Sequence, residues 1–146
     1  MSETTHLHIF QAESDSHMEL PYADCGIKAG FPSPAQDYMS ESIDLNRELV
    51  RHKECTFYAR VEGESMRDAG IGNGDLVVID RSLEPHDGCY VAAYIDDGFT
   101  LKQYKSDPAH NCAWLVPANP DFEPIRVTPE DEFIVWGVIT HCIRTL

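Results

Sequence analysis

Basic residues are scarce in this chain of 146 residues, where 11 Lys and Arg stand against 25 Asp and Glu and the formal net charge is −14. Tight binding to nucleic acid needs clustered cations that release counterions from phosphates, so this composition argues against direct DNA binding. Anionic membrane surfaces are disfavoured for the same reason. A partner protein with a basic surface is compatible with this charge.

Long apolar runs and paired cysteine motifs are also absent from the sequence. No run approaches the roughly 20 apolar residues of a membrane-spanning helix. The first residues lack the basic and then apolar pattern of a signal peptide, so we expect a cytoplasmic protein. The five cysteines are scattered without a C-x-x-C pair. This spacing argues against a disulfide framework and a structural zinc site, and we expect no metal or cofactor.

The first 38 residues have the features of an extended arm. Five acidic residues precede the first basic residue, Lys28. The apolar residues of this stretch keep no sustained period of 2 or 3.6, and prolines and glycines interrupt regular structure. We therefore predict a flexible N-terminal arm over residues 1–38 and one folded domain over residues 39–146.

The folded domain is predicted to begin with a short helix and to continue as strands. Helical spacing of apolar residues favours a helix over Ser40 to His52, with Ser40 and Ser42 as candidate N-caps. Asp96-Asp97-Gly98 is typical of a hairpin turn. Apolar and alternating runs predict strands at 56–61, 75–80, 90–95, 99–104, 114–116, 125–127 and 133–139. This spacing predicts a mostly β fold, a sandwich or a barrel.

One serine lies where a nucleophile would be expected. Gly63-Glu64-Ser65-Met66 follows directly on a predicted strand. A glycine two residues before a serine allows a tight turn that lifts the hydroxyl out of the sheet. If a helical turn follows, its first N–H groups would face a developing oxyanion. A Gly-x-Ser triplet alone is weak evidence, because most such triplets are ordinary loops.

Lys102 is the candidate base, and it is one of only four lysines. It lies within a predicted strand, Phe99 to Tyr104, where a lysine usually points to solvent at a sheet edge. The alternative is an inward lysine whose desolvated amine has a lowered pKa and accepts the proton of Ser65. Thr100 is two residues away on the same strand face, where its hydroxyl would orient the amine. The seven histidines suggest no better Ser-His-Asp arrangement.

Several segments, taken together, closely resemble the UmuD proteins, the LexA-like self-cleaving peptidases of bacterial error-prone DNA repair. The segments are Ala29-Gly30-Phe31-Pro32-Ser33-Pro34-Ala35, Ile43-Asp44-Leu45-Asn46, Gly63-Glu64-Ser65-Met66, Gly70-Ile71, Gly74-Asp75-Leu76 and Phe99-Thr100-Leu101-Lys102. The resemblance covers about residues 25 to 146. It implies the family's strongly bent, mostly β peptidase fold, with Ser65 as the nucleophile, Lys102 as the general base and the backbone amides of Glu64 and Ser65 as oxyanion donors.

The resemblance also implies partners. The working state would be a homodimer, and a RecA filament on single-stranded DNA would stimulate self-cleavage in the SOS response. The shortened chain would then join a UmuC-type polymerase in the translesion enzyme DNA polymerase V. Two other functions stay open: a regulatory interaction module with the same fold that works uncleaved, and a self-cleaving repressor, which would need a basic recognition helix.

Two bonds compete as the site of the cut. Both Cys25–Gly26 and Ala29–Gly30 join a small residue to glycine, which allows the backbone to approach a nucleophile closely. Only Ala29–Gly30 is followed directly by Phe-Pro-Ser-Pro, the sequence that follows the family's cut. The prolines keep that side of the bond extended. We therefore predict cleavage at Ala29–Gly30.

Overall fold

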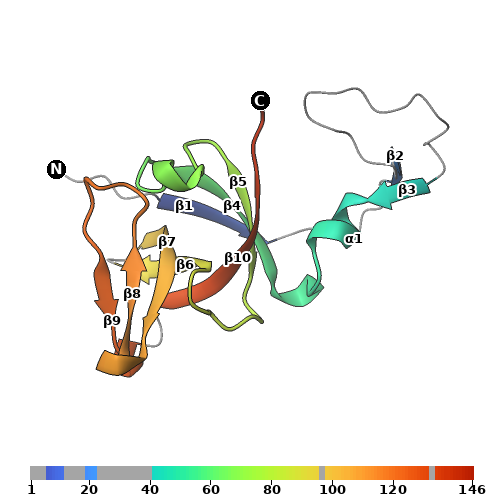
Figure 1. Ribbon diagram of the computed structural model, residues 1–146. Coiled ribbons are helices and arrows are strands. Elements are labelled where there is room, and N and C mark those ends of the chain that lie inside the picture. The colour runs from blue at the N-terminus through green and yellow to red at the C-terminus, as the bar shows by residue number, and fades with distance from the viewer. Residues whose placement is uncertain (1–5, 12–18, 23–40, 96–97, 132–133) are drawn as a thin grey trace, which may run out of the picture. The chain divides into compact units, whose positions relative to one another are not determined.

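The computed structural model (Figure 1) separates the chain into two compact units. It describes residues 6–11, 19–22, 41–95, 98–131 and 134–146. Residues 6–11 and 54–146 belong to the first unit, and residues 19–22 and 41–53 belong to the second. Both units contain mainly strands, which confirms the predicted mostly β fold.

The first unit is an antiparallel sheet of eight strands that curls on itself (Figure 1). The strands are β1 (His6–Gln11), β4 (Thr56–Glu62), β5 (Leu76–Asp80), β6 (Tyr90–Ile95), β7 (Gly98–Asp107), β8 (Cys112–Val116), β9 (Ile125–Val127) and β10 (Val135–Ile143). They neighbour one another in the order β1-β4-β5-β10-β6-β7-β8-β9. His6 of β1 also pairs with Thr100 of β7, and this contact closes the first six strands of that order into a barrel.

The core lies on both faces of the curled sheet. Because successive side chains of a strand point to opposite faces, β6 contributes Ala92 to one cluster and Val91 and Ala93 to the other. The first cluster comprises Leu7, Ala59, Val61, Met66, Ile71, Val77, Ile79, Ala92 and Leu101. The second comprises Cys89, Val91, Ala93, Leu115, Val127 and Val138. A sheet buried on two faces explains the continuous apolar runs from which these strands were predicted.

β10 lies between β5 and β6 in the sheet, and its pairing with these strands has two shifts of register. Its register against β6 shifts between Val135 and Gly137, and its register against β5 shifts after Ile139. Gly137 is required at the first of these positions, because a Cβ there would lie 2.7 Å from Cγ2 of Ile79. Such bulges bend a strand, and they allow β10 to follow the curvature of the barrel.

The second unit is small. β2 (Glu19–Tyr22) pairs antiparallel with β3 (Glu41–Asp44), and α1 (Leu45–Leu49) follows directly. The helix predicted over Ser40 to His52 is therefore only five residues long, because the residues before Leu45 form a strand. Its N-cap is Asp44, whose Oδ1 accepts a hydrogen bond from the N–H of Asn46 at 3.0 Å. The serines predicted to cap it lie too early in the chain.

The N-terminal residues differ from the arm that the sequence analysis expects. His6–Gln11 forms a strand of the main sheet, and Glu19–Tyr22 forms a strand of the second unit. The signal for β1 is its alternation, because Leu7 and Ile9 face the core while His8 and Phe10 are exposed. Two apolar residues are too few to give a sustained period, so this strand is visible only once β4 is beside it.

The strands predicted from residue 56 onward are confirmed, with small changes in their ends. β6 and β9 have the predicted bounds, whereas β7, β8 and β10 are longer than predicted. Short 3₁₀ turns lie at Lys53–Cys55, Arg67–Ala69, Pro108–His110 and Pro129–Asp131. Among the described residues, none of the helices has the length and apolar character needed to cross a membrane.

Candidate active site

Ser65 lies in the turn that follows β4. The strand ends at Glu62, and Gly63 has a φ of +108°, a conformation that glycine adopts without strain. A 3₁₀ turn then begins at Arg67, as the sequence suggested. Ser65 is fully buried, with 0% of its surface exposed. The hydroxyl therefore lies within the protein, where a charge that develops on it is poorly solvated.

Met66 fixes this turn to the core. Its side chain is fully buried and belongs to the first core cluster. Its carbonyl accepts hydrogen bonds from the N–H groups of Ala69 and Ile71, at 3.0 and 3.3 Å. The N–H of Gly63 donates to Oδ1 of Asn73 at 3.2 Å. The residue after the candidate nucleophile is thus an anchor, and Ser65 is held between it and the end of β4.

Lys102 is buried, so the interpretation as a solvent-facing edge lysine is wrong. It lies in the middle of β7, pairs with Val91 of β6, and exposes only 1% of its surface. Burial in this apolar surrounding lowers the pKa of the Lys102 amine, because desolvation disfavours the charged form. Within the part of the chain that the structure describes, no carboxylate forms an ion pair with this amine.

Thr100 shares the face of Lys102 on β7. It pairs with Ala93 as Lys102 pairs with Val91, and both partners belong to the second core cluster. Thr100 is also buried, with 5% of its surface exposed. The predicted alternation on β7 is therefore confirmed: these two polar side chains lie on one face, and Leu101 between them contributes to the first cluster.

The loop after β8 contacts both the serine turn and the lysine. The side-chain amide of Asn119 donates to the carbonyl of Glu64 at 3.0 Å, and the N–H of Ala118 lies 3.4 Å from Sδ of Met66. Phe122, in the same loop, places its ring centroid 5.9 Å from Nζ of Lys102. The N–H of Phe122 in turn donates to the carbonyl of Asn119 at 3.1 Å.

This loop is the part of the candidate site that the sequence did not predict. Asn119 is buried, with 5% of its surface exposed, although asparagine in a loop is usually solvated. The only signal in the sequence is an asparagine between two prolines, Pro117 and Pro120, which is equally typical of an ordinary turn. Asn119 binds the backbone beside Ser65, and Phe122 lies against the amine of Lys102. The loop therefore contacts the surroundings of both predicted residues.

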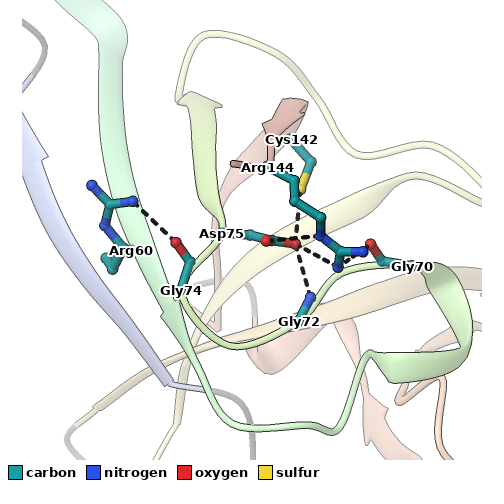
Figure 2. Close-up of polar contacts among 7 residues, drawn as sticks. All are labelled: Arg60, Gly70, Gly72, Gly74, Asp75, Cys142 and Arg144. Atoms are coloured by element: carbon teal, nitrogen blue, oxygen red, sulfur yellow. Dashed lines mark hydrogen bonds and ion pairs between the residues drawn. The ribbon is translucent and has the colours of Figure 1, made fainter. Parts of the chain in front are cut away.

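An ion pair between the half-exposed Arg144 and the buried Asp75 holds the chain just beyond the serine turn (Figure 2). The carboxylate of Asp75 accepts from Nε and Nη2 of Arg144, at 3.1 and 3.0 Å, and from the N–H of Gly72 at 2.9 Å. Nη2 of Arg144 also donates to the carbonyl of Gly70 at 2.9 Å. These bonds, above all the one from Arg144, hold the pKa of Asp75 below its ordinary value. The C-terminal residues thereby fasten the segment after Ser65.

The candidate cleavage bonds Ala29–Gly30 and Cys25–Gly26 both lie outside the described residues. A cleft of about 640 Å³ opens between β7, β9 and β10, but Ser65 and Lys102 do not line it. Its walls include Arg81 and Trp136, whose guanidinium and ring are 4.3 Å apart. Because neither Ser65 nor Lys102 lines this cleft, we do not assign the cleft to the candidate active site.

Comparison with known proteins defines the class to which this fold and site belong. The Peptidase S24-like family matches residues 21–140, and the chain belongs to that family. This is a family of self-cleaving serine peptidases, which agrees with a serine and a lysine buried in a curled β sheet.

Within that family the chain is a UmuD-type protein of SOS mutagenesis. It is 39% identical over 137 residues to Protein MucA of Salmonella typhimurium, which covers 92% of each chain. It is 37% identical over 150 residues to Protein ImpA of Shigella flexneri, covering 99% of this chain and 96% of that protein. It is 36% identical to LexA repressor 1 of Pseudomonas syringae pv. tomato, but spans only 57% of that protein.

Proposed function

We propose that this protein cuts its own backbone at Ala29–Gly30, with Ser65 as the nucleophile and Lys102 as the general base. The observation that carries the proposal is the burial of Lys102 in apolar surroundings, since a desolvated amine is neutral at a pH where an exposed lysine is charged. A buried serine in the turn after β4, bracketed with Lys102 by the loop of Asn119 and Phe122, supports the pairing.

The chemistry follows in two steps. Nζ of Lys102 takes the proton of the Ser65 hydroxyl while Oγ attacks the carbonyl carbon of Ala29. The amides of Glu64 and Ser65 donate to the oxyanion, and Lys102 returns the proton to the amine of Gly30 as the peptide bond breaks. Water then attacks the ester on Ser65, with Lys102 again as base, and leaves a carboxylate on Ala29. The hydroxyl of Thr100 orients the amine.

The cut serves to change partners. We infer that a RecA filament on single-stranded DNA stimulates it, and that the shortened chain, as a homodimer, joins a UmuC-type polymerase in error-prone translesion synthesis. Similarity to MucA and ImpA over more than nine tenths of the chain supports this assignment. The net charge of −14 favours binding to a polymerase subunit rather than to DNA itself.

The test is the mass of the intact chain over time, with and without activated RecA. Wild type is expected to yield a new N-terminus at Gly30, and N-terminal sequencing separates this from a cut at Gly26. Ser65→Ala and Lys102→Ala are expected to slow the cut by at least about 10²-fold. Lys105→Ala, which removes an exposed lysine of the same strand, is the matched control. Cleavage of Lys102→Ala at the wild-type rate would refute the dyad, and an unchanged mass of wild type would favour the uncleaved interaction module.

A further inference from the structure

β1 precedes the proposed cut in the chain, yet it belongs to the barrel that follows the cut. Its six residues pair antiparallel with β4, from His6 opposite Glu62 to Gln11 opposite Phe57. In Figure 1 β1 lies alongside β4. Two described strands, β1 and β2, precede Ala29–Gly30 in the chain. Of these two, only β1 belongs to the main sheet, where it lies beside β4.

The inner face of β1 completes the core. Leu7 is opposite Val61 and exposes only 6% of its surface, and Ile9 packs against the same cluster. That cluster also contains Met66, the anchor of the serine turn. The outer face differs, because Phe10 is 56% exposed. Without β1, its position would therefore be a groove with apolar contact sites for two alternate residues of a strand, those filled now by Leu7 and Ile9.

The backbone of β4 that faces β1 can be assigned by alternation. The N–H of Val61 donates to the carbonyl of Asp75, and the carbonyl of Val61 accepts from Gly74, so the peptide groups of Val61 point toward β5. Alternate residues of a strand direct their peptide groups to opposite sides. The N–H and C=O groups of Tyr58, Arg60 and Glu62 consequently point toward β1.

A cut anywhere between β1 and β4 changes how β1 is held. In the intact chain the linker keeps β1 at an effective concentration of about millimolar. After the cut, β1 is held by the pairing of six residues with β4, by the pairing of His6 with Thr100 of β7, and by the packing of Leu7 and Ile9 in the core. Dissociation of the strand would leave the peptide groups of β4 that face β1 as an open edge, which invites pairing with another strand.

We propose that β1 is a removable strand, and that the edge of β4 it leaves takes up an extended segment of a partner protein by strand addition. The proposal rests on the proposed self-cleavage. The partner segment runs antiparallel to β4, places apolar residues at the positions of Leu7 and Ile9, and binds through its backbone. A polar residue that can donate a hydrogen bond suits the position of His8, because His8 hydrogen-bonds to the exposed carboxylate of Glu62 and is directly opposite Arg60.

A second copy of this chain fits the groove less well. A copy that has been cut has lost its own β1 and has no such strand to donate. An uncut copy keeps its β1 seated in its own sheet at the higher effective concentration. The negative net charge of the chain also favours a basic partner over another copy.

The experiment separates this proposal from the proposed dyad. A recognition sequence for a site-specific protease is inserted between Ala29 and Gly30 of the Ser65→Ala chain, so that the cut does not depend on self-cleavage. After digestion the chain is passed over a sizing column at micromolar concentration. The probe is a fluorescent peptide of residues 5–12. The filtered, cut chain is expected to bind this probe about 10²-fold more tightly than the uncut chain.

Matched peptides test the chemistry of the groove. A probe with Leu7→Asp and Ile9→Asp is expected to lose binding, whereas Phe10→Ser is expected to keep it, since Phe10 is exposed. His8→Gln should bind more tightly than His8→Leu, because only glutamine can donate a hydrogen bond to Glu62. Equal affinity of all four probes would overturn the proposed partner chemistry.

Amide hydrogen exchange tests the open edge directly. Removal of β1 is expected to expose the amides of Tyr58, Arg60 and Glu62 and to leave those of Phe57, Ala59 and Val61 protected. The probe peptide should restore the protection. Coelution of residues 1–29 with the cut chain, or exposure of all these amides together, would overturn a removable strand on a stable edge. Edge amides that become protected without the probe as the concentration of the cut chain rises would assign the groove to a second copy instead.

Discussion

β1 and β10 border the candidate active site from the two ends of the chain, and they are attached to it in different ways. His6 of β1 pairs with Thr100, two residues from Lys102. Arg144, just after β10, binds Asp75 and Gly70 in the segment that follows Ser65. Both candidate cleavage bonds lie between β1 and β4, so a cut separates β1 from Ser65 but leaves Arg144 on the same chain. Under the proposed cleavage, the N-terminal end of the chain is therefore removed and the C-terminal end is kept.

The largest expected effect is on the rate of self-cleavage, and it tests whether Lys102 is the general base. Because burial lowers the pKa of Lys102, the neutral amine is available below the ordinary lysine pKa of about 10.4. The rate of self-cleavage should rise about tenfold per pH unit and level off once the pH passes the lowered pKa. Single-turnover rates by intact mass from pH 6 to pH 10 check this. A rate independent of pH would remove Lys102 from the role of base.

Leu7 tests how much the removable end contributes to the intact fold. Leu7→Ala in the Ser65→Ala chain should lower the free energy of unfolding by about 3 kcal/mol, because a buried leucine leaves a cavity. Phe10→Ala, on the exposed face of the same strand, should change it by less than about 1 kcal/mol. Urea denaturation measures both. Equal losses for the two variants would mean that β1 does not seat Leu7 in the core.

Arg144 tests the permanent end. Arg144→Ala should lower the free energy of unfolding more than the control below, since charge-assisted hydrogen bonds to a buried carboxylate are lost. The folded-state pKa of Asp75 is lowered, so its contribution is present above the unfolded pKa and is lost as pH falls through the folded one. The variant's deficit should therefore shrink in acid. Arg126→Ala, an exposed arginine of β9, is the control in urea denaturation at pH 7 and pH 3.

Thr100 gives the smallest expected effect, and it lies where β1 and Lys102 meet. Thr100→Val keeps the shape and burial of the side chain but removes its hydroxyl. We expect self-cleavage to slow by up to about tenfold while the pH at which the rate levels off stays below the ordinary lysine value. Thr140→Val, on β10, is the control. A wild-type rate in Thr100→Val would limit this residue to a structural role.

The sequence predicted most of the barrel because its strands are locally encoded. β6 and β9 are bounded as expected, since their apolar runs end at turn residues on both sides. β1 was not predicted because only two of its residues, Leu7 and Ile9, face the core. They are recognisable as core residues only from their pairing with Val61 and Ala59 of β4. The helix near residue 45 was predicted too long because pairing with β2, a contact distant in sequence, turns Glu41–Asp44 into a strand.

The candidate site was predicted unevenly for the same physical reason. Ser65 and Lys102 were found from short segments, since a turn glycine and a lysine within an apolar strand are local signals. The burial of Lys102 depends on neighbours from β6 and on Phe122, which are distant in sequence, so no local pattern predicts it. Asn119 and Arg144 act through hydrogen bonds to residues more than fifty positions away, so sequence patterns did not reveal them.

The burial of Lys102 also has a consequence for how such a protein is maintained by selection. A buried amine that pairs with no carboxylate of the described residues costs the fold stability, and this cost grows as pH falls from the ordinary lysine pKa to the lowered one. Lys102→Met should therefore give a chain that is more stable at neutral pH and inert. Stability alone favours the loss of this lysine, so its presence in the chain is accounted for by the proposed reaction.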